Sequence, residues 1–231
     1  MKTLCIIPAR GGSKRIPRKN IKPFLGRPVI SYAIETALKS GLFDEVMVST
    51  DDEEIAEIAR QYGASVPFMR SAEAASDTAP DVVVLREVLT EYKNRGRQFD
   101  VFCSLYPCTP LVTVESLKLG MQTLLDSGAD FVTPVIRFSS PPLRGIVYRN
   151  GEWVRLCPEY TYTRSQDMEP IYCFAGQYTF FDGRTYLEKD DTERKMFAFE
   201  ISEMEVQDVD NEIDWKMAEI KYKLLYQEDS L

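Results

Sequence analysis

A cluster of basic residues near the start of the chain has the composition of an anion-binding segment. Residues 1–34 contain eight Lys and Arg and no Asp or Glu, although the formal net charge of the chain is −8. The rest of the chain, with 20 basic and 36 acidic side chains, therefore carries −16. Such a local cluster in an acidic protein favours a small, multiply charged anion over a nucleic acid.

The cluster combines glycines with cations. Seven of the eight basic residues lie between Arg10 and Arg27. Gly11 and Gly12 allow backbone amides to approach a phosphate. The side chains that can neutralise its charge are those of Lys14, Arg15, Arg18 and Lys19. The spacing is neither that of a Walker A loop nor that of a GxGxxG fingerprint. A solvated basic loop is the alternative interpretation.

Two carboxylates near the end of the chain have the spacing of a metal site. Asp208 and Asp210 are two residues apart, so in an extended segment they project to the same side. Paired carboxylates bind a hard cation such as Mg²⁺ together with substrate phosphates. The alternative is helix capping, because a helical pattern begins near Asp214.

Two further polar segments could contact a substrate. Ser76, in a Ser-Asp-Thr run after Arg70, lies where a nucleobase pocket could form, although this run is also an ordinary helix cap. Arg164 begins an Arg-Ser-Gln-Asp run among aromatic residues, which suits a carboxylate clamp. The alternative for Arg164 is an incidental charge in an exposed loop.

The elements that must position these residues alternate between strands and helices. Strands are predicted at residues 4–7, 46–50, 64–68, 101–105 and 131–135. Helices are predicted at residues 29–38, 51–62, 82–92, 114–125 and 213–226, with Thr50 or Asp51 capping the second. This alternation predicts a three-layer, doubly wound α/β fold. The basic segment then follows the first strand, at the edge where open α/β sheets bind ligands.

The pattern changes between about residues 137 and 181. Prolines and short aromatic runs replace helical periodicity, and Asn150-Gly151 predicts a hairpin between residues 146–148 and 153–154. We expect one domain spanning residues 1–231, with this stretch inserted and its exposed apolar side chains packing on another subunit. The last few residues are expected to fray.

The composition excludes several classes of chemistry. The chain has no histidine, which excludes His-based triads, imidazole acid–base catalysis and most zinc sites. Five irregularly spaced cysteines do not suggest a disulfide framework and favour a reducing cytoplasm. No apolar run is long enough to span a membrane.

Taken together, these segments resemble the cytidylyltransferases that activate nonulosonic (sialic-type) acids. The sequence from Ile7 to Asn20, Ile-Pro-Ala-Arg-Gly-Gly-Ser-Lys-Arg-Ile-Pro-Arg-Lys-Asn, is similar to the family signature. The similarity continues in order along nearly the whole chain, through Ser49-Thr50-Asp51, Arg70, Ser76-Asp77-Thr78, Pro107-Cys108-Thr109-Pro110, Arg164-Ser165-Gln166-Asp167 and Asp208-Val209-Asp210. The Arg-Ser-Gln-Asp and Ala-Gly-Gln-Tyr runs are most similar to members that use pseudaminic acid.

The resemblance implies a Rossmann-like nucleotidyltransferase fold, with CTP and a nonulosonic acid as substrates and Mg²⁺ as cofactor. The nucleotide-binding residues that it implies are Ala9, Arg10, Gly11, Gly12, Ser13, Lys14, Lys19, Asn20, Arg70 and Ser76. It assigns the metal to Asp208 and Asp210, and the sugar to Tyr106, Arg164, Gln177 and Tyr178. The residues expected to carry catalysis are Arg10, Lys14, Lys19, Asp208 and Asp210. Residues 137–181 correspond to the dimerisation insert of the family, so a cytoplasmic homodimer is expected, without nucleic acid or membrane.

Two departures from the family concern the sugar. Tyr106-Pro107-Cys108-Thr109-Pro110 stands where sialic acid synthetases commonly have Gln-Pro-Thr-Ser-Pro, which argues against N-acetylneuraminate. Tyr172-Cys173-Phe174 stands where pseudaminic-type enzymes tend to carry a His-Asp pair. Legionaminic, N-acetylneuraminic and 3-deoxy-manno-octulosonic acids are the alternative substrates. A non-catalytic nucleotide-binding module is the alternative from another class.

Overall fold

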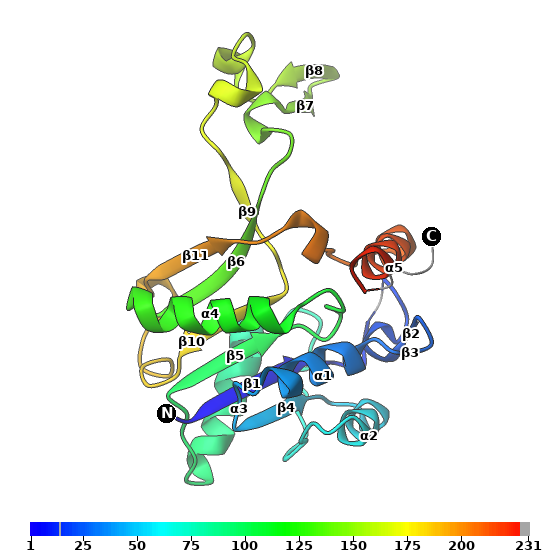
Figure 1. Ribbon diagram of the computed structural model, residues 1–231, viewed down its shortest axis with the longest axis vertical. Helices are drawn as coiled ribbons and strands as arrows, with labels where there is room; N and C mark the ends of the chain where they lie inside the picture. Colours follow the sequence, from blue (N-terminus) through cyan, green and yellow to red (C-terminus); the bar gives the residue numbers. More distant parts are fainter. Residues whose placement is uncertain (14, 227–231) are drawn as a thin grey trace.

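The computed structural model describes residues 1–13 and 15–226, and of Asp191 only the backbone. Its centre is a seven-stranded sheet (Figure 1). In spatial order the strands are β11 (Met196–Glu200), β6 (Phe131–Arg137), β10 (Tyr178–Asp182), β5 (Val101–Leu105), β1 (Thr3–Pro8) and β4 (Glu45–Ser49), and β9 (Tyr172–Phe174) also pairs with β6.

The sheet is mixed but mostly parallel. Strand β1 pairs in parallel with β4 and β5, and β11 pairs in parallel with β6. Strand β10 is antiparallel to both β5 and β6, and β9 is antiparallel to β6. The predicted α/β architecture with a mostly parallel sheet is confirmed.

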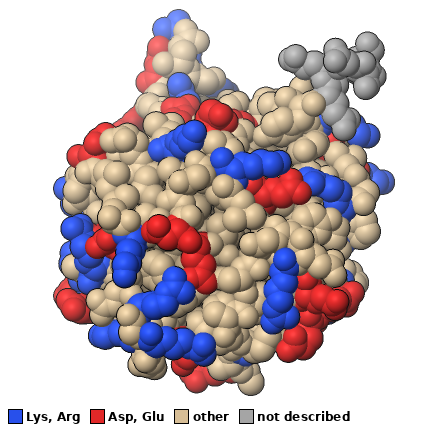
Figure 2. Space-filling model, turned by 60° about the horizontal axis from the view of Figure 1, so that its bottom comes forward, with Lys and Arg blue, Asp and Glu red and all other residues tan. Residues whose placement is uncertain are grey.

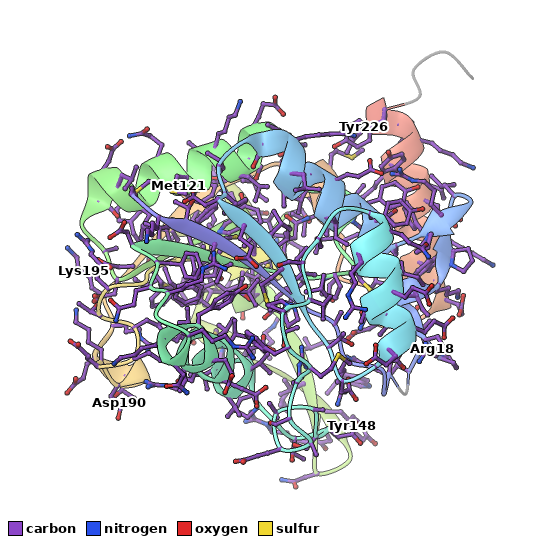
Figure 3. The ribbon with its side chains drawn as sticks, turned by 90° about the horizontal axis from the view of Figure 1, so that it is seen from below. Arg18, Met121, Tyr148, Asp190, Lys195 and Tyr226 are labelled. Atoms are coloured by element: carbon purple, nitrogen blue, oxygen red, sulfur yellow. The ribbon has the colours of Figure 1, made fainter. Side chains whose placement is uncertain are left out.

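Helices cover both faces of the sheet. Helices α1 (Ile30–Ser40), α2 (Glu53–Gln61) and α4 (Val114–Ser127) pack on one face, and α3 (Asp81–Asn94) packs on the other (Figure 3). The apolar run of β1 explains this, because Cys5 and Ile7 point to the first face and Leu4 and Ile6 to the second, all fully buried. A strand buried on both faces has a continuous apolar sequence.

The terminal helix α5 (Glu212–Tyr226) lies at one side of the molecule and covers the basic segment rather than the sheet. Its Trp215 packs with Ile16 and with Phe24 of a small hairpin, β2 (Pro23–Phe24) and β3 (Arg27–Pro28). The remaining short 3-10 turns span Lys19–Ile21, Pro142–Arg144, Pro158–Tyr160, Ser165–Asp167, Asp191–Glu193 and Glu203–Glu205.

Two local predictions are wrong. Residues 64–68 form no strand, because only Ser65 makes a bridge, to Met47 of β4. The cap of α2 is Asp52, whose side chain accepts a hydrogen bond from the Ile55 amide (3.1 Å), rather than Thr50 or Asp51. The residues expected to fray, 227–231, lie outside the described residues.

A long excursion leaves the sheet between β6 and β9. We call residues 138–171 the arm, and Figure 1 shows it rising away from the body of the molecule. Its tip is the predicted hairpin, formed by β7 (Ile146–Arg149) and β8 (Glu152–Arg155). Asn150 and Gly151 both have positive φ, 53° and 88°, as a two-residue type I′ turn requires.

The expected insert extended to about residue 181, but its last residues belong to the centre of the sheet. Strand β10 lies between β5 and β6, and Tyr178 and Phe180 pack into the core below α4. The aromatic run at 178–181 therefore belongs to the core. Among the described residues, no helix has the length and apolar character needed to cross a membrane.

Candidate active site

The carboxyl ends of β1, β4 and β5 meet at one edge of the sheet, where two pockets adjoin. The basic pocket, of about 490 Å³, is lined among others by Arg10, Ser13, Arg70, Ser76 and Asp81. The acidic pocket, of about 330 Å³, is lined among others by Cys108, Gly176, Asp208 and Asp210. Both pockets are bordered by Arg15, Lys19, Asn20 and Tyr106. The structure thus brings together segments that lie up to two hundred residues apart in the sequence.

The basic segment is held in shape by Asn20 and Arg18. The buried Asn20 amide donates a hydrogen bond to the Arg10 carbonyl (2.9 Å) and accepts one from the Cys108 thiol (3.3 Å). Arg18 has a left-handed φ of 55°, and its guanidinium pairs with Asp52 and Glu54 of α2 (Figure 3). These contacts tie the segment to α2, and Arg18 is not among the residues that line the two pockets.

Gly11 is a second point where the segment lies close to the start of α2. Its amide donates a hydrogen bond to Asp51 Oδ1 (2.9 Å). A Cβ added at Gly11 would lie 2.7 Å from Asp52 Oδ2, whereas one at Gly12 would meet no atom within 4 Å. Because Asp52 is already fixed by Ile55 and Arg18, it cannot move aside without losing the cap of α2.

Gly11→Ala is therefore expected to lower the free energy of unfolding by about 1–2 kcal/mol, through loss of that cap and steric crowding. Gly12→Ala is the matched control, and it should change the free energy by less than about 0.5 kcal/mol. Urea denaturation of both variants measures the difference. Equal stabilities would contradict the close contact with Asp52.

Arg70 is a buried cation at the floor of the basic pocket. It donates hydrogen bonds to Ser49 Oγ (3.0 Å) and to the Ser49 carbonyl (2.6 Å), at the end of β4. Burial lowers the pKa of Arg70, and nearby carboxylates, including those of Asp51 and Asp81, oppose this. A guanidinium fixed in this way presents its remaining donors in a rigid orientation.

Arg10 closes the other side of the basic pocket. Its guanidinium pairs with Asp77 (2.8 Å) and donates a weaker hydrogen bond to the Ser76 carbonyl (3.4 Å). Of the other predicted nucleotide ligands, Ala9 is fully buried and its amide donates to the Ser49 carbonyl (2.9 Å). Lys14 lies outside the described residues.

Asp208 and Asp210 line a pocket and do not cap the terminal helix. Asn211 caps α5 by accepting hydrogen bonds from the Ile213 and Asp214 amides (2.8 and 3.1 Å). Asp214 accepts from the amides of Asp210 and Asn211 (2.9 and 3.0 Å). Capping is thus done by Asn211 and Asp214, and the carboxylates of Asp208 and Asp210 line the acidic pocket.

Two cations join the acidic pocket to the basic segment. Arg15 pairs with the Asp210 carboxylate, and the Lys19 ammonium donates a hydrogen bond to the Val209 carbonyl. Val209 itself is buried against α5. Lys19 therefore lies between the segment that carries the aspartates and the site expected for phosphate.

Two predicted sugar ligands prove to be buried. Gln177 is 2% exposed and donates a hydrogen bond to the Glu205 carbonyl (2.5 Å). Tyr178 is 1% exposed, its hydroxyl donates to the Ser116 carbonyl (2.8 Å), and burial raises its pKa. Tyr178 is the first residue of the central strand β10 and Gln177 immediately precedes it, and neither side chain is among the residues that line the two pockets.

Arg164 is also away from both pockets of its own chain. It lies in the arm and pairs with Asp167 (2.8 Å), three residues later. Asp77, from the Ser-Asp-Thr run that the sequence singled out, pairs with Arg10, whereas Asp81, which accepts a hydrogen bond from the Tyr106 hydroxyl, was not singled out. Asp81 begins α3, where a carboxylate is ordinary for a helix. Nothing in its local sequence indicated a contact with Tyr106.

The charge distribution is consistent with a localised anion site. On the face shown in Figure 2, basic and acidic side chains are interspersed and form no broad area of one sign. The cations that border the pockets instead gather at the edge of the sheet, in Arg10, Arg15, Lys19 and Arg70.

Comparisons with known proteins agree with this geometry. Residues 4–152 match the family model described as Cytidylyltransferase. The chain is 39% identical over 226 residues to the pseudaminic acid cytidylyltransferase of Campylobacter jejuni subsp. jejuni serotype O:2, with 97% of each chain covered. It is 32% identical over 228 residues to the CMP-N,N'-diacetyllegionaminic acid synthase of Legionella pneumophila, with 95% of each covered.

A solved structure shows the same fold. The CMP:2-keto-3-deoxy-manno-octonic acid synthetase complexed with CTP has a TM-score of 0.72 and 20% identity, covering 99% of this chain and 100% of that chain. The family model spans more than half of the chain, and the curated relatives align along almost all of it. This protein therefore belongs to the cytidylyltransferase family, the nucleotidyltransferase enzymes that use CTP.

Proposed function

We propose that this cytidylyltransferase activates pseudaminic acid. The anomeric hydroxyl of the sugar acid attacks the α-phosphorus of CTP, the bond from that phosphorus to the bridging oxygen breaks, and pyrophosphate leaves. The observation that carries the proposal is the junction of a basic and an acidic pocket at Lys19 and Tyr106. The choice of sugar is supported by the relative at 39% identity that is named for pseudaminic acid.

The basic pocket would bind CTP. Arg10 and Lys19 would neutralise the triphosphate, and the negative charge that grows on the leaving pyrophosphate makes their contribution largest in the transition state. Arg70, rigidly held on Ser49, would contact the cytosine together with Ser76. The sugar acid would enter the acidic pocket beside Tyr106.

The donors at Asp208 and Asp210 fit Mg²⁺. Among the described residues, no three His, Cys, Asp or Glu side chains are grouped to hold a metal ion by themselves. Mg²⁺ is usually held by one or two carboxylates together with substrate phosphates, and two pocket-lining carboxylates beside a phosphate site match that requirement. When bound, the ion neutralises phosphate charge and acidifies a nearby hydroxyl. We assign the proton of the sugar hydroxyl to the carboxylate of Asp208, the more exposed of the pair.

A homodimer would complete the site. The arm carries large exposed apolar side chains, with Trp153 at 68% and Tyr162 at 96% exposure, alongside Ile146, Tyr148 and Leu156. Such a concentration is unusual for a free surface and typical of an interface. Since Arg164 lies in the arm, it would clamp the sugar carboxylate in the neighbouring subunit. The five cysteines, all free thiols, support a cytoplasmic location.

We expect the wild-type protein to be a dimer and the Trp153→Glu variant to be a monomer. The substitution would bury a charge in the apolar interface. Glu152→Gln, on the same strand and exposed, is the control and should leave the dimer intact. Light scattering coupled to gel filtration measures the mass of each variant. A monomeric wild type, or a dimeric Trp153→Glu variant, would contradict the role of the arm.

The function is tested by pyrophosphate release from CTP with Mg²⁺, comparing pseudaminic, legionaminic, N-acetylneuraminic and 3-deoxy-manno-octulosonic acids. We expect strong turnover of pseudaminic acid alone. A preference for another acid would transfer the assignment to that sugar, with Tyr106 and Cys173 as the first residues to examine. No turnover with any acid, with CTP binding indifferent to Mg²⁺, would favour a non-catalytic nucleotide-binding module.

A further inference from the structure

Tyr106, together with Arg15, Lys19 and Asn20, forms the border that the basic and the acidic pocket share. Its side chain is half-buried and borders both. The backbone is fixed on either side, because the Tyr106 amide donates to the Gln177 carbonyl (2.8 Å) and its carbonyl accepts from Thr109 Oγ1 (2.7 Å). With the backbone fixed, the position of the ring depends on the side-chain torsions and on what binds its hydroxyl.

A carboxylate from another element binds that hydroxyl. The Tyr106 hydroxyl donates a hydrogen bond to Asp81 Oδ2, at the first residue of α3. Burial and the negative charge of Asp81 raise the pKa of Tyr106, so the hydroxyl remains a donor at neutral pH. The contact joins the start of α3 to the carboxyl end of β5, directly at the junction of the two pockets.

Asp81 is not required to hold the buried guanidinium of Arg70 in place. Arg70 is anchored by two hydrogen bonds to Ser49, and the carboxylates of Asp51 and Glu87 also favour its charge. Removing Asp81 leaves these contacts in place. Asp81 itself lines the basic pocket, but the hydrogen bonds that anchor Arg70 do not involve it, and the hydrogen bond that its removal breaks is the one from Tyr106.

We infer that Asp81 is a positioning residue of the transfer reaction, which fixes the Tyr106 ring through its hydroxyl and thereby aligns the sugar acid with the bound nucleotide. The inference rests on the proposed function. Without Asp81 the ring can occupy other staggered torsions, and the border between the pockets moves. A misplacement of about 1 Å in a reacting group costs about 10²-fold in rate.

The test compares Asp81→Ala, Asp81→Asn, Tyr106→Phe and the double variant Asp81→Ala/Tyr106→Phe. For Asp81→Ala we expect kcat with the sugar acid to fall about 10- to 100-fold. Its calorimetric affinity for CTP and its melting temperature should stay near those of the wild type. Asp81→Asn retains an acceptor oxygen and should restore kcat to within about threefold.

The two partners should act as one unit. The kcat of Tyr106→Phe is expected to equal that of Asp81→Ala, because each substitution removes the same hydrogen bond. The kcat of the double variant should then be no lower than that of either single variant. Glu91→Gln is the matched control: it removes a carboxylate from the far end of α3, where Glu91 pairs with Arg95. It should leave kcat unchanged.

Three results would overturn the inference: wild-type kcat in Asp81→Ala, an Asp81→Asn variant as slow as Asp81→Ala, or losses that multiply in the double variant. Each variant is compared with wild-type protein that has first been shown to release pyrophosphate. A wild type without turnover on any of the four sugar acids is a different outcome, which refutes the proposed function and the inference with it.

Discussion

Asp208→Asn and Asp210→Asn are each expected to lower the rate of pyrophosphate release by about 10²–10³-fold at saturating Mg²⁺. Asn keeps the size of the side chain but removes the charge that holds the metal. Neither carboxylate caps α5, since Asn211 and Asp214 do so. The loss should therefore appear in turnover, with the melting temperature nearly unchanged.

A rate assay over a range of Mg²⁺ concentrations measures this effect. The half-saturating Mg²⁺ concentration should rise in both variants. Glu212→Gln is the control, because this exposed carboxylate lies two residues further on and pairs with Lys22. Its turnover should match the wild type. Near-wild-type turnover of both Asn variants would refute the assignment of the metal to this pair.

Lys19→Met is expected to lower kcat/KM for CTP by about 10²–10³-fold. The Lys19 ammonium borders both pockets and donates to the Val209 carbonyl, between the two aspartates. Its replacement removes a charge from the phosphate site and a link between the basic segment and residues 208–210. Steady-state kinetics with CTP varied at saturating sugar acid measures the change.

Lys22→Met is the matched control for this prediction. It lies three residues after Lys19 and pairs with Glu212 outside both pockets. An exposed ion pair contributes about 0–1 kcal/mol, so kcat/KM should remain within a few fold of the wild type. Equal effects of Lys19→Met and Lys22→Met would indicate a general loss of positive charge rather than a specific contact.

The sequence was sufficient for features that depend on near neighbours along the chain. The apolar run of β1 predicts a strand buried on both faces, and Asn150-Gly151 predicts the turn of the arm hairpin. The basic segment after β1 predicts an anion site at the carboxyl edge of the sheet. The strand and the turn are confirmed because side-chain periodicity and backbone preference act within a few residues, whereas the anion site stays a prediction.

Other features were decided by contacts between distant residues. Strand β10 inserts antiparallel between β5 and β6, which buries Gln177 and Tyr178, and Arg18 turns to α2 rather than to the pocket. The hydrogen bond from Tyr106 to Asp81 joins two elements that look unrelated in the sequence. A local sequence pattern does not predict such contacts, because the packing of the whole sheet and its helices determines which side chains meet.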